Sequence, residues 1–240
     1  MIKQVVRDYS IVAKLTPTEK FAVGDSASPK ALIFHIQASN ELPTDVLDIG
    51  FGAGTLGQMI KANPATSHWS VDGIDGWWPN CQNQALLDQR IYRNIWHGLA
   101  QDLPSEQLQR YRLICLLDVI EHLEAETARR LLRDLLSSMA DDASLFISTP
   151  LWFYPQHAHQ DGDLEEHLIG IPATSMMVLM PYLYAVNHPL IGGFVLGKRS
   201  LEFIDFFHPT ADRGFSFDKG MKIANAIGMQ CQAGVVYKMP

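Results

Sequence analysis

The run VLDIGFGAGTLG, residues 46–57, constrains the fold of this chain more than any other stretch. Its first half is apolar and favours a buried strand. Its second half carries glycine at alternate positions, Gly50, Gly52 and Gly54. Because glycine has no Cβ, a ligand can lie directly against the main chain of this turn. The N–H groups of the turn and of the helix expected from Thr55 would point at that ligand, which indicates a nucleotide-like molecule.

Strands and helices alternate after residue 40. The expected strands are short and rich in apolar, β-branched or aromatic residues, at 45–49, 68–74, 90–96, 112–117 and 143–148. Residues 124–139 form the clearest helix, because Leu131, Leu135 and Met139 recur at helical spacing. This alternation predicts an α/β, doubly wound, mainly parallel sheet with helices on both faces. Ligands in such sheets bind beyond the carboxyl ends of the strands.

The length of 240 residues and 47% hydrophobic composition predict a single globular domain over residues 1–240. We expect residues 40–150 to form the ligand-binding core, 151–200 an insert or lid, and 201–240 a segment of uncertain role. The last segment allows two readings, an extension after a closing strand at 193–198, or a helix at 219–227 with a last strand at 231–237. The uncharged stretch 168–186 is nearly long enough to span a bilayer, but its prolines favour a buried helix or an apolar lid.

The composition limits the kinds of binding partner that we expect for this chain. The formal net charge of -7 argues against a broad nucleic-acid surface and favours a small-molecule substrate. Cys81, Cys115 and Cys231 are too widely spaced for zinc pairs or a disulfide framework, and the amino terminus has no signal-peptide pattern. We therefore expect reduced thiols in a cytoplasmic protein without a membrane span. The sequence does not indicate an oligomeric state.

Two kinds of nucleotide compete for the glycine turn. Residues 52–57 also satisfy the G-x-G-x-x-G spacing of dinucleotide-binding folds. Asp48, two positions before the first glycine, would repel a pyrophosphate and suit a ligand that carries ammonium and sulfonium groups. The resulting pattern, Asp-x-Gly-x-Gly-x-Gly, resembles the first motif of the class I S-adenosylmethionine-dependent methyltransferases.

Later segments extend this resemblance in the order that the family shows. Asp75, at the end of the second expected strand, occupies the position that binds the ribose hydroxyls, although the same offset suits a nicotinamide enzyme. Trp77 follows it and could stack on adenine. Residues 97–104, HGLAQDLP, resemble the second motif, except that Leu99 replaces the usual acid and leaves the N–H of Ala100 to reach the adenine.

Two further runs resemble the family at the fourth and fifth strands. ICLLDVIEHLE, residues 114–124, matches the D-V-[IL]-E-H-[LI] pattern, which places Asp118 and Val119 toward the donor. FISTP, residues 146–150, matches the end of the fifth strand, with Leu151 in place of asparagine, which favours a more apolar acceptor.

The resemblance implies a seven-stranded Rossmann-like methyltransferase sheet, S-adenosyl-L-methionine as cofactor, and in-line methyl transfer to a small-molecule acceptor. The cofactor-binding residues would be Asp48, Gly50, Phe51, Gly52, Gly54, Asp75, Gly76, Trp77, Leu99, Ala100, Asp118 and Val119. His122 and His157 are the candidate bases, with a packed histidine and a polar loop as the alternatives. We expect no metal, since His157, His159, Asp161 and Glu165 form no compact ligand set in sequence. The alternatives are a non-catalytic protein that binds S-adenosylmethionine and an NAD(P)-dependent oxidoreductase.

Overall fold

The computed structural model describes residues 10–14, 30–36, 44–187, 191–214, 217–226, 228–229 and 235–238. The strands are β1 Ser10–Lys14, β2 Asp45–Ile49, β3 Ser70–Asp75, β4 Asn94–His97, β5 Leu113–Leu117, β6 Ser144–Pro150, β7 Leu183–Asn187, β8 Ile191–Gly197 and β9 Val235–Lys238. The α-helices are α2 Ile33–Ile36, α3 Thr55–Ala62, α4 Trp78–Cys81, α5 Ala85–Asp88, α6 Ser105–Leu108, α7 Ala125–Ser138, α8 Ala173–Met177 and α9 Phe217–Ala226. Short 3-10 helices lie at Ala100–Asp102, Ile120–His122 and Lys198–Phe206.

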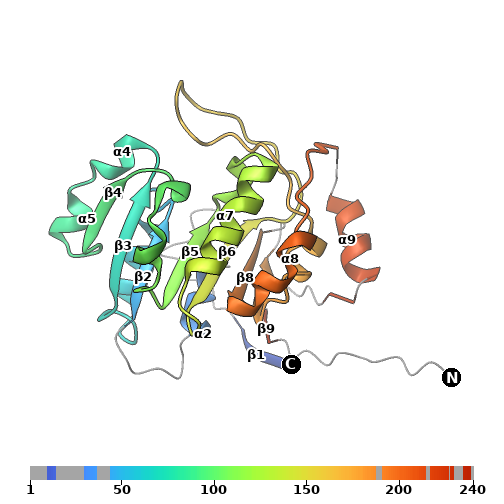
Figure 1. The fold of residues 1–240 in the computed structure, drawn as a ribbon, viewed down its shortest axis with the longest axis horizontal. Helices are drawn as coiled ribbons and strands as arrows, with labels where there is room; N and C mark the ends of the chain where they lie inside the picture. Colours follow the sequence, from blue (N-terminus) through green and yellow to red (C-terminus); the bar gives the residue numbers. More distant parts are fainter. Residues whose placement is uncertain are drawn as a thin grey trace.

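The strands form one sheet in the order β1-β9-β7-β8-β6-β5-β2-β3-β4 (Figure 1). Strands β2 to β6 are mutually parallel, whereas β8 lies antiparallel between β6 and β7. The doubly wound α/β fold is confirmed. Nine strands exceed the expected seven, because β9 and β1 add antiparallel at the β7 edge. This pairing joins the two ends of the chain, so no local pattern could predict it.

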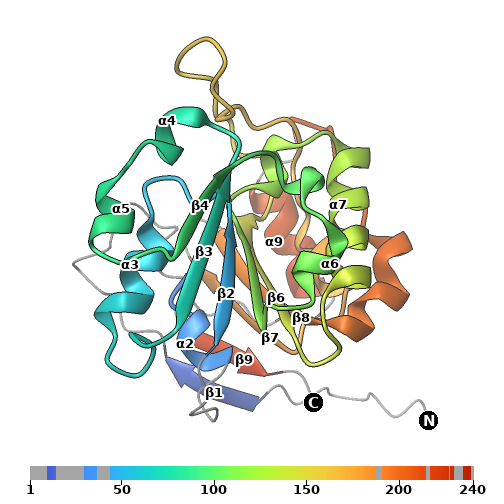
Figure 2. The ribbon, with the colours of Figure 1, turned by 60° about the vertical axis from the view of Figure 1, so that its left-hand side comes forward.

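Two apolar layers cover the sheet (Figure 2). Leu47, Leu116 and the apolar stripe of α7 belong to one core cluster. Val46, Cys115 and the buried face of α3 belong to the other. Neighbouring residues of one strand thus face opposite layers, as the period of two requires. The predicted helix at 124–139 is confirmed within a residue at each end, and the strand predicted at 45–49 matches β2.

The uncharged stretch 168–186 contains a buried helix, which was one of the two expectations for it, but this helix is short. It is the five-residue helix α8, after which the chain enters β7. Met176, Leu179 and Tyr184 are fully buried, so the stretch packs into the core. Among the described residues, none of the helices has the length and apolar character needed to cross a bilayer. Both expectations for the carboxyl-terminal region are met in part. The strand expected at 193–198 is present as β8, and the helix and last strand of the other expectation are present as α9 and β9, although residues 231–234 lie outside the described residues.

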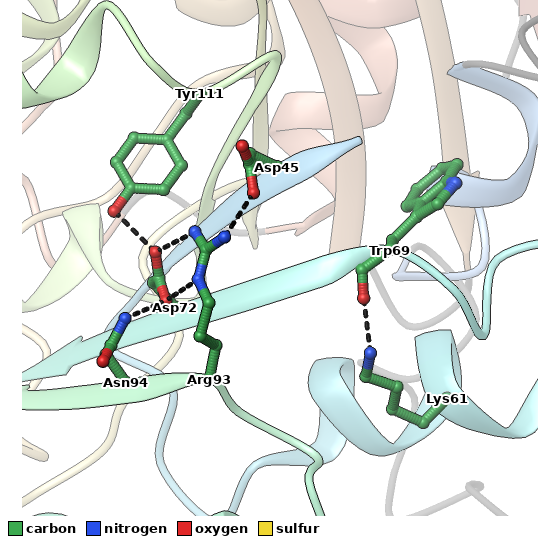
Figure 3. Close-up of polar contacts among 7 residues, drawn as sticks. All are labelled: Asp45, Lys61, Trp69, Asp72, Arg93, Asn94 and Tyr111. Atoms are coloured by element: carbon green, nitrogen blue, oxygen red, sulfur yellow. Dashed lines mark hydrogen bonds and ion pairs between the residues drawn. The ribbon is translucent and has the colours of Figure 1, made fainter. Parts of the chain in front are cut away.

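A closed polar network ties the amino ends of the parallel strands together (Figure 3). Asp72 of β3 is fully buried and accepts hydrogen bonds from Arg93 at 3.0 and 2.6 Å, from Asn94 at 2.9 Å and from Tyr111 at 2.9 Å. Arg93 also pairs with Asp45 at 2.8 Å. This network lies opposite the carboxyl ends where a ligand is expected, so it serves the fold.

Candidate cofactor and acceptor site

A cavity of about 950 Å³ lies at the carboxyl ends of β2 to β6. The strand order divides it at β2 into a β3/β4 half and a β5/β6 half. The first half is lined by the residues expected to hold adenosine: Asp75, Gly76, Trp77, Leu99 and Ala100. The second half is lined by Glu121, His122, His167 and the segment 150–154. Gly50, Gly52, Asp118 and Val119 also line the cavity.

The turn after β2 requires glycine at two of its positions. Gly50 has φ +70° and Gly52 has φ +56°, which is the left-handed region. A Cβ on Gly50 would lie 2.5 Å from Cγ2 of Val119, so a side chain there would both strain the backbone and clash. A Cβ on Gly52 would meet no neighbouring atom within 4 Å. The open space beside Gly52 belongs to the cavity, where a ligand can approach the main chain.

Asp75 connects the glycine turn to the end of β3. Its carboxylate accepts from the N–H of Gly52 at 2.9 Å, from the N–H of Trp77 at 2.8 Å and from the amide of Asn80 at 3.1 Å. Three of about four lone-pair positions are therefore occupied, which leaves room for one more donor. Asp75 both shapes the turn and presents a carboxylate to the cavity.

Three of the expected cofactor residues lie behind the cavity wall. Asp48 is 2% exposed and accepts a hydrogen bond from the Tyr92 hydroxyl at 2.6 Å. Phe51 packs against the Tyr92 ring, and Gly54 precedes α3 at φ +81°. None of the three lines the cavity, because the turn directs them into the α3 layer. Burial raises the pKa of Asp48 to about 6 despite the opposing effects of the Tyr92 hydrogen bond and the Lys30 charge.

The β3/β4 half of the cavity places the two tryptophans differently. Trp77 lines the cavity, whereas Trp78 is 54% exposed and makes an edge-to-face contact with His97. Leu99, in place of the family's usual acid, approaches Gly76 closely enough that a Cβ on this glycine would lie 2.7 Å from Cδ2 of Leu99. This part of the cavity is therefore narrow and apolar.

Asp118 follows β5 with φ +56°, which is unusual for a residue with a side chain. Its carboxylate accepts from Ser148 at 2.7 Å and forms an ion pair with Lys30, whose side chain is 12% exposed. Lys30 lies just before α2. No local signal could reveal its partner, which lies 88 positions away.

Glu121, His122 and His167 form a cluster in the β5/β6 half. One candidate ligand atom from each lies within 4.8 Å of the other two. The two imidazole rings meet edge to face at 4.7 Å between centroids. Burial, and then the Asp118 charge, raise the pKa of Glu121, whereas burial lowers the pKa of His167. His167 belongs to the same polar segment, 157–167, as His157, and nothing in the composition of that segment distinguishes the histidine that lines the cavity from the exposed one.

The other candidate base lies elsewhere. His157 is exposed and does not line the cavity. His159, Asp161 and Glu165 are exposed as well, and among the described residues they form no ligand cluster with His157. Figure 1 shows why, since the gold segment after β6 rises away from the sheet before it returns toward it.

Comparison with known proteins agrees with this geometry. A family model described as a methyltransferase domain matches residues 26–183. The chain belongs to this methyltransferase family. This membership confirms the resemblance carried by the glycine turn and the DVIEH run. Among proteins with curated functions, none matches the sequence.

Several solved structures are similar to this chain at low sequence identity. The N-terminal domain of EvdMO1 with SAH bound has a TM-score of 0.50 at 13% identity, over 71% of this chain and 79% of that one. The PH0226 protein from Pyrococcus horikoshii OT3 has a TM-score of 0.42 at 14% identity, over 56% of each chain. The plantazolicin methyltransferase BpumL has a TM-score of 0.42 at 18% identity, over 52% of this chain and 46% of that one. This chain spans about half the length of the last two.

Proposed function

We propose that this chain transfers a methyl group from S-adenosyl-L-methionine to a small-molecule acceptor. The observation that carries the proposal is Asp75, which accepts a hydrogen bond from the Gly52 N–H and lines the β3/β4 half of the cavity, where we place adenosine. This carboxylate joins the glycine turn to the ribose position expected for a methyltransferase. The SAH-bound EvdMO1 domain supports the choice of cofactor, since it shares this fold.

The donor would lie across the turn. We place adenine against Trp77 and Ala100, ribose at Asp75 and the methionine part over Gly50 and Gly52. The cavity wall near β5 carries Asp118, and Asp48 is buried behind the turn. Carboxylates favour a sulfonium and an ammonium group and disfavour a diphosphate. This charge distribution supports S-adenosylmethionine over NAD.

The acceptor would occupy the β5/β6 half. Leu151 and Trp152 line this half and are almost fully buried, which supports an acceptor with an apolar body. In-line displacement needs the attacking atom about 3 Å from the methyl carbon, opposite sulfur, with water excluded. Of the two expected bases, only His122 lines the cavity, so His122 is the candidate that could take a proton from the acceptor.

Calorimetry with S-adenosylhomocysteine and NAD tests the donor. We expect S-adenosylhomocysteine to bind preferentially and Asp75→Ala to weaken it at least tenfold. Asp134→Ala, an exposed acid on α7, is the matched control and should bind as the wild type does. Preferential binding of NAD, or equal affinity of Asp75→Ala and wild type, would contradict the proposal.

Transfer itself needs a separate assay. A panel of apolar acceptors with radiolabelled S-adenosylmethionine should yield a labelled product. Firm donor binding with no transfer across oxygen, nitrogen and thiol acceptors would favour a non-catalytic binding protein.

A further inference from the structure

We propose that Glu121, His122 and His167 bind one divalent transition-metal ion in the acceptor half of the cavity. Their ligand atoms lie within 4.8 Å of one another, and all three residues line the cavity. Ligand atoms bound to one tetrahedral ion at about 2.1 Å lie roughly 3.4 Å apart. The ligand atoms therefore need to approach one another by about 1.4 Å at most to share an ion.

Both imidazoles are oriented as metal ligands usually are. Nδ1 of His122 lies 3.1 Å from the carbonyl of Glu166, and Nδ1 of His167 lies 2.7 Å from the carbonyl of Tyr154. A carbonyl can only accept, so each Nδ1 carries the proton. In a neutral ring Nε2 then keeps its lone pair. A backbone carbonyl bound to the second nitrogen is the common support of a metal-binding histidine.

Glu121 supplies the third, anionic ligand. Its side chain is buried, and Oε2 accepts a hydrogen bond from Thr149 at 3.1 Å. Its other oxygen, Oε1, is buried with no hydrogen-bond partner among the described residues. Leaving such an oxygen without a partner in the interior costs about 1–3 kcal/mol or more. A metal ion would satisfy it.

The backbone holds the three residues together although they come from two distant segments. The carbonyl of Glu121 accepts from the N–H of Leu168 at 2.8 Å. The N–H of His167 donates to the carbonyl of Gln156 at 3.1 Å. These contacts place the segment 154–168 against the 3-10 helix Ile120–His122. Main-chain hydrogen bonds therefore hold the two segments of the cluster next to each other.

Two imidazoles and one carboxylate select the class of ion. This set suits Zn²⁺, Fe²⁺, Co²⁺ or Mn²⁺, whereas Mg²⁺ and Ca²⁺ prefer oxygen ligands alone. Three protein ligands leave at least one position open for an oxygen of the acceptor. If the proposed function holds, the ion would lower the pKa of that oxygen and hold it near the methyl group. In that case His122 would be a metal ligand and not the base of the proposed function, in contrast to the expectation of no metal.

Titration of the chelator-stripped full chain with Co²⁺ tests the site without any assay of methyl transfer. We expect saturable binding of one equivalent, with visible absorption bands of bound Co²⁺ that Zn²⁺ abolishes and Mg²⁺ does not. Glu121→Gln, His122→Ala and His167→Ala should each weaken binding about tenfold or more. His68→Ala removes an exposed histidine far from the cluster and should leave binding unchanged.

The controls separate this inference from the proposed donor. Each variant is checked for its melting temperature and its affinity for S-adenosylhomocysteine. A chain that binds Co²⁺ but not S-adenosylhomocysteine keeps the metal site and loses the proposed function, and the reverse result overturns the metal site alone. If a variant does not fold, crystals of the wild type soaked in Co²⁺ should show an anomalous peak between the three side chains. No peak there, or equal Co²⁺ affinity in folded variants, would overturn the inference.

Discussion

Two buried carboxylates of this chain have opposite surroundings. Asp72 and Glu121 are 0% and 2% exposed. Asp72 accepts four hydrogen bonds from three side chains, whereas Glu121 accepts one from a side chain and leaves Oε1 without a partner among the described residues. A buried charge is tolerated when its hydrogen bonds are complete. The comparison therefore separates a carboxylate whose hydrogen bonds are complete from one that keeps an oxygen available to a ligand.

Position in the sheet explains the difference. The Asp72 network closes the amino ends of the strands, where turns can supply donors at no cost to a binding site (Figure 3). Glu121 lies at the carboxyl ends, where the loops must leave space for ligands. Asp48 is an intermediate case, since it is buried and accepts from one side-chain donor, Tyr92, in the part of the chain that the structure describes.

The largest effect on stability should come from Asp72→Ala. This change leaves Tyr111 and Asn94 without their acceptor and Arg93 with only Asp45. Breaking a buried pair by removing one partner costs about 3–5 kcal/mol, toward the lower end here because Arg93 is partly exposed. Urea unfolding measures this loss, with Asp88→Ala as an exposed control. A loss below about 1 kcal/mol would show that the Asp72 network contributes little to the stability of the fold, and the contrast with Glu121 would not hold.

Asp48→Asn should change how stability depends on pH. Because the folded pKa of Asp48 is raised to about 6, the folded wild type binds a proton that the unfolded chain has lost, and its free energy of unfolding falls as pH rises from about 4 to about 6. This fall amounts to roughly 3 kcal/mol relative to Asp48→Asn. Denaturant titrations of both proteins at pH 4 to 7 measure it. Parallel curves would show that Asp48 is not titrating in this range.

The titration of Asp72 should change the free energy of unfolding in the opposite direction, so that stability rises with pH. Its burial alone would raise the pKa, but the hydrogen bonds from Arg93, Asn94 and Tyr111 lower it overall. The network therefore stabilises the protein above the unfolded pKa of about 4 and is lost as pH falls through the folded value. In Asp72→Asn this acid-side loss should be absent.

Glu121→Gln should leave the free energy of unfolding unchanged or raise it by about 1 kcal/mol. Glutamine keeps the size of the side chain and an acceptor for Thr149, and it is always neutral, whereas the raised pKa of Glu121 reflects the cost of burying an ionised carboxylate. Urea unfolding of the metal-free proteins measures the free energy of unfolding of Glu121→Gln and of Asp72→Asn. Asp72→Asn should be less stable than the wild type. A large loss of stability in Glu121→Gln would mean that Glu121 serves the fold as Asp72 does.

Lys30→Gln should have the smallest effect. The ion pair with Asp118 is only partly buried, so its loss should lower the free energy of unfolding by less than about 1 kcal/mol. The same variant should weaken S-adenosylhomocysteine binding only a few-fold, because Ser148 still holds Asp118. Calorimetry checks this, with Lys198→Gln as a control distant from the cavity. Loss of binding as large as in Asp75→Ala would place Lys30 among the residues that directly support the donor.

The sequence by itself determined the alternation of strands and helices, the glycine turn and the positions of Asp75 and Asp118, because each depends on neighbouring residues and on the period of an element. Only the tertiary structure decided which of these side chains reach the cavity. It turned Asp48 and Phe51 inward, paired Lys30 with Asp118, and brought His167 to Glu121. Such contacts depend on segments far apart in the chain, and no local pattern carries information about them.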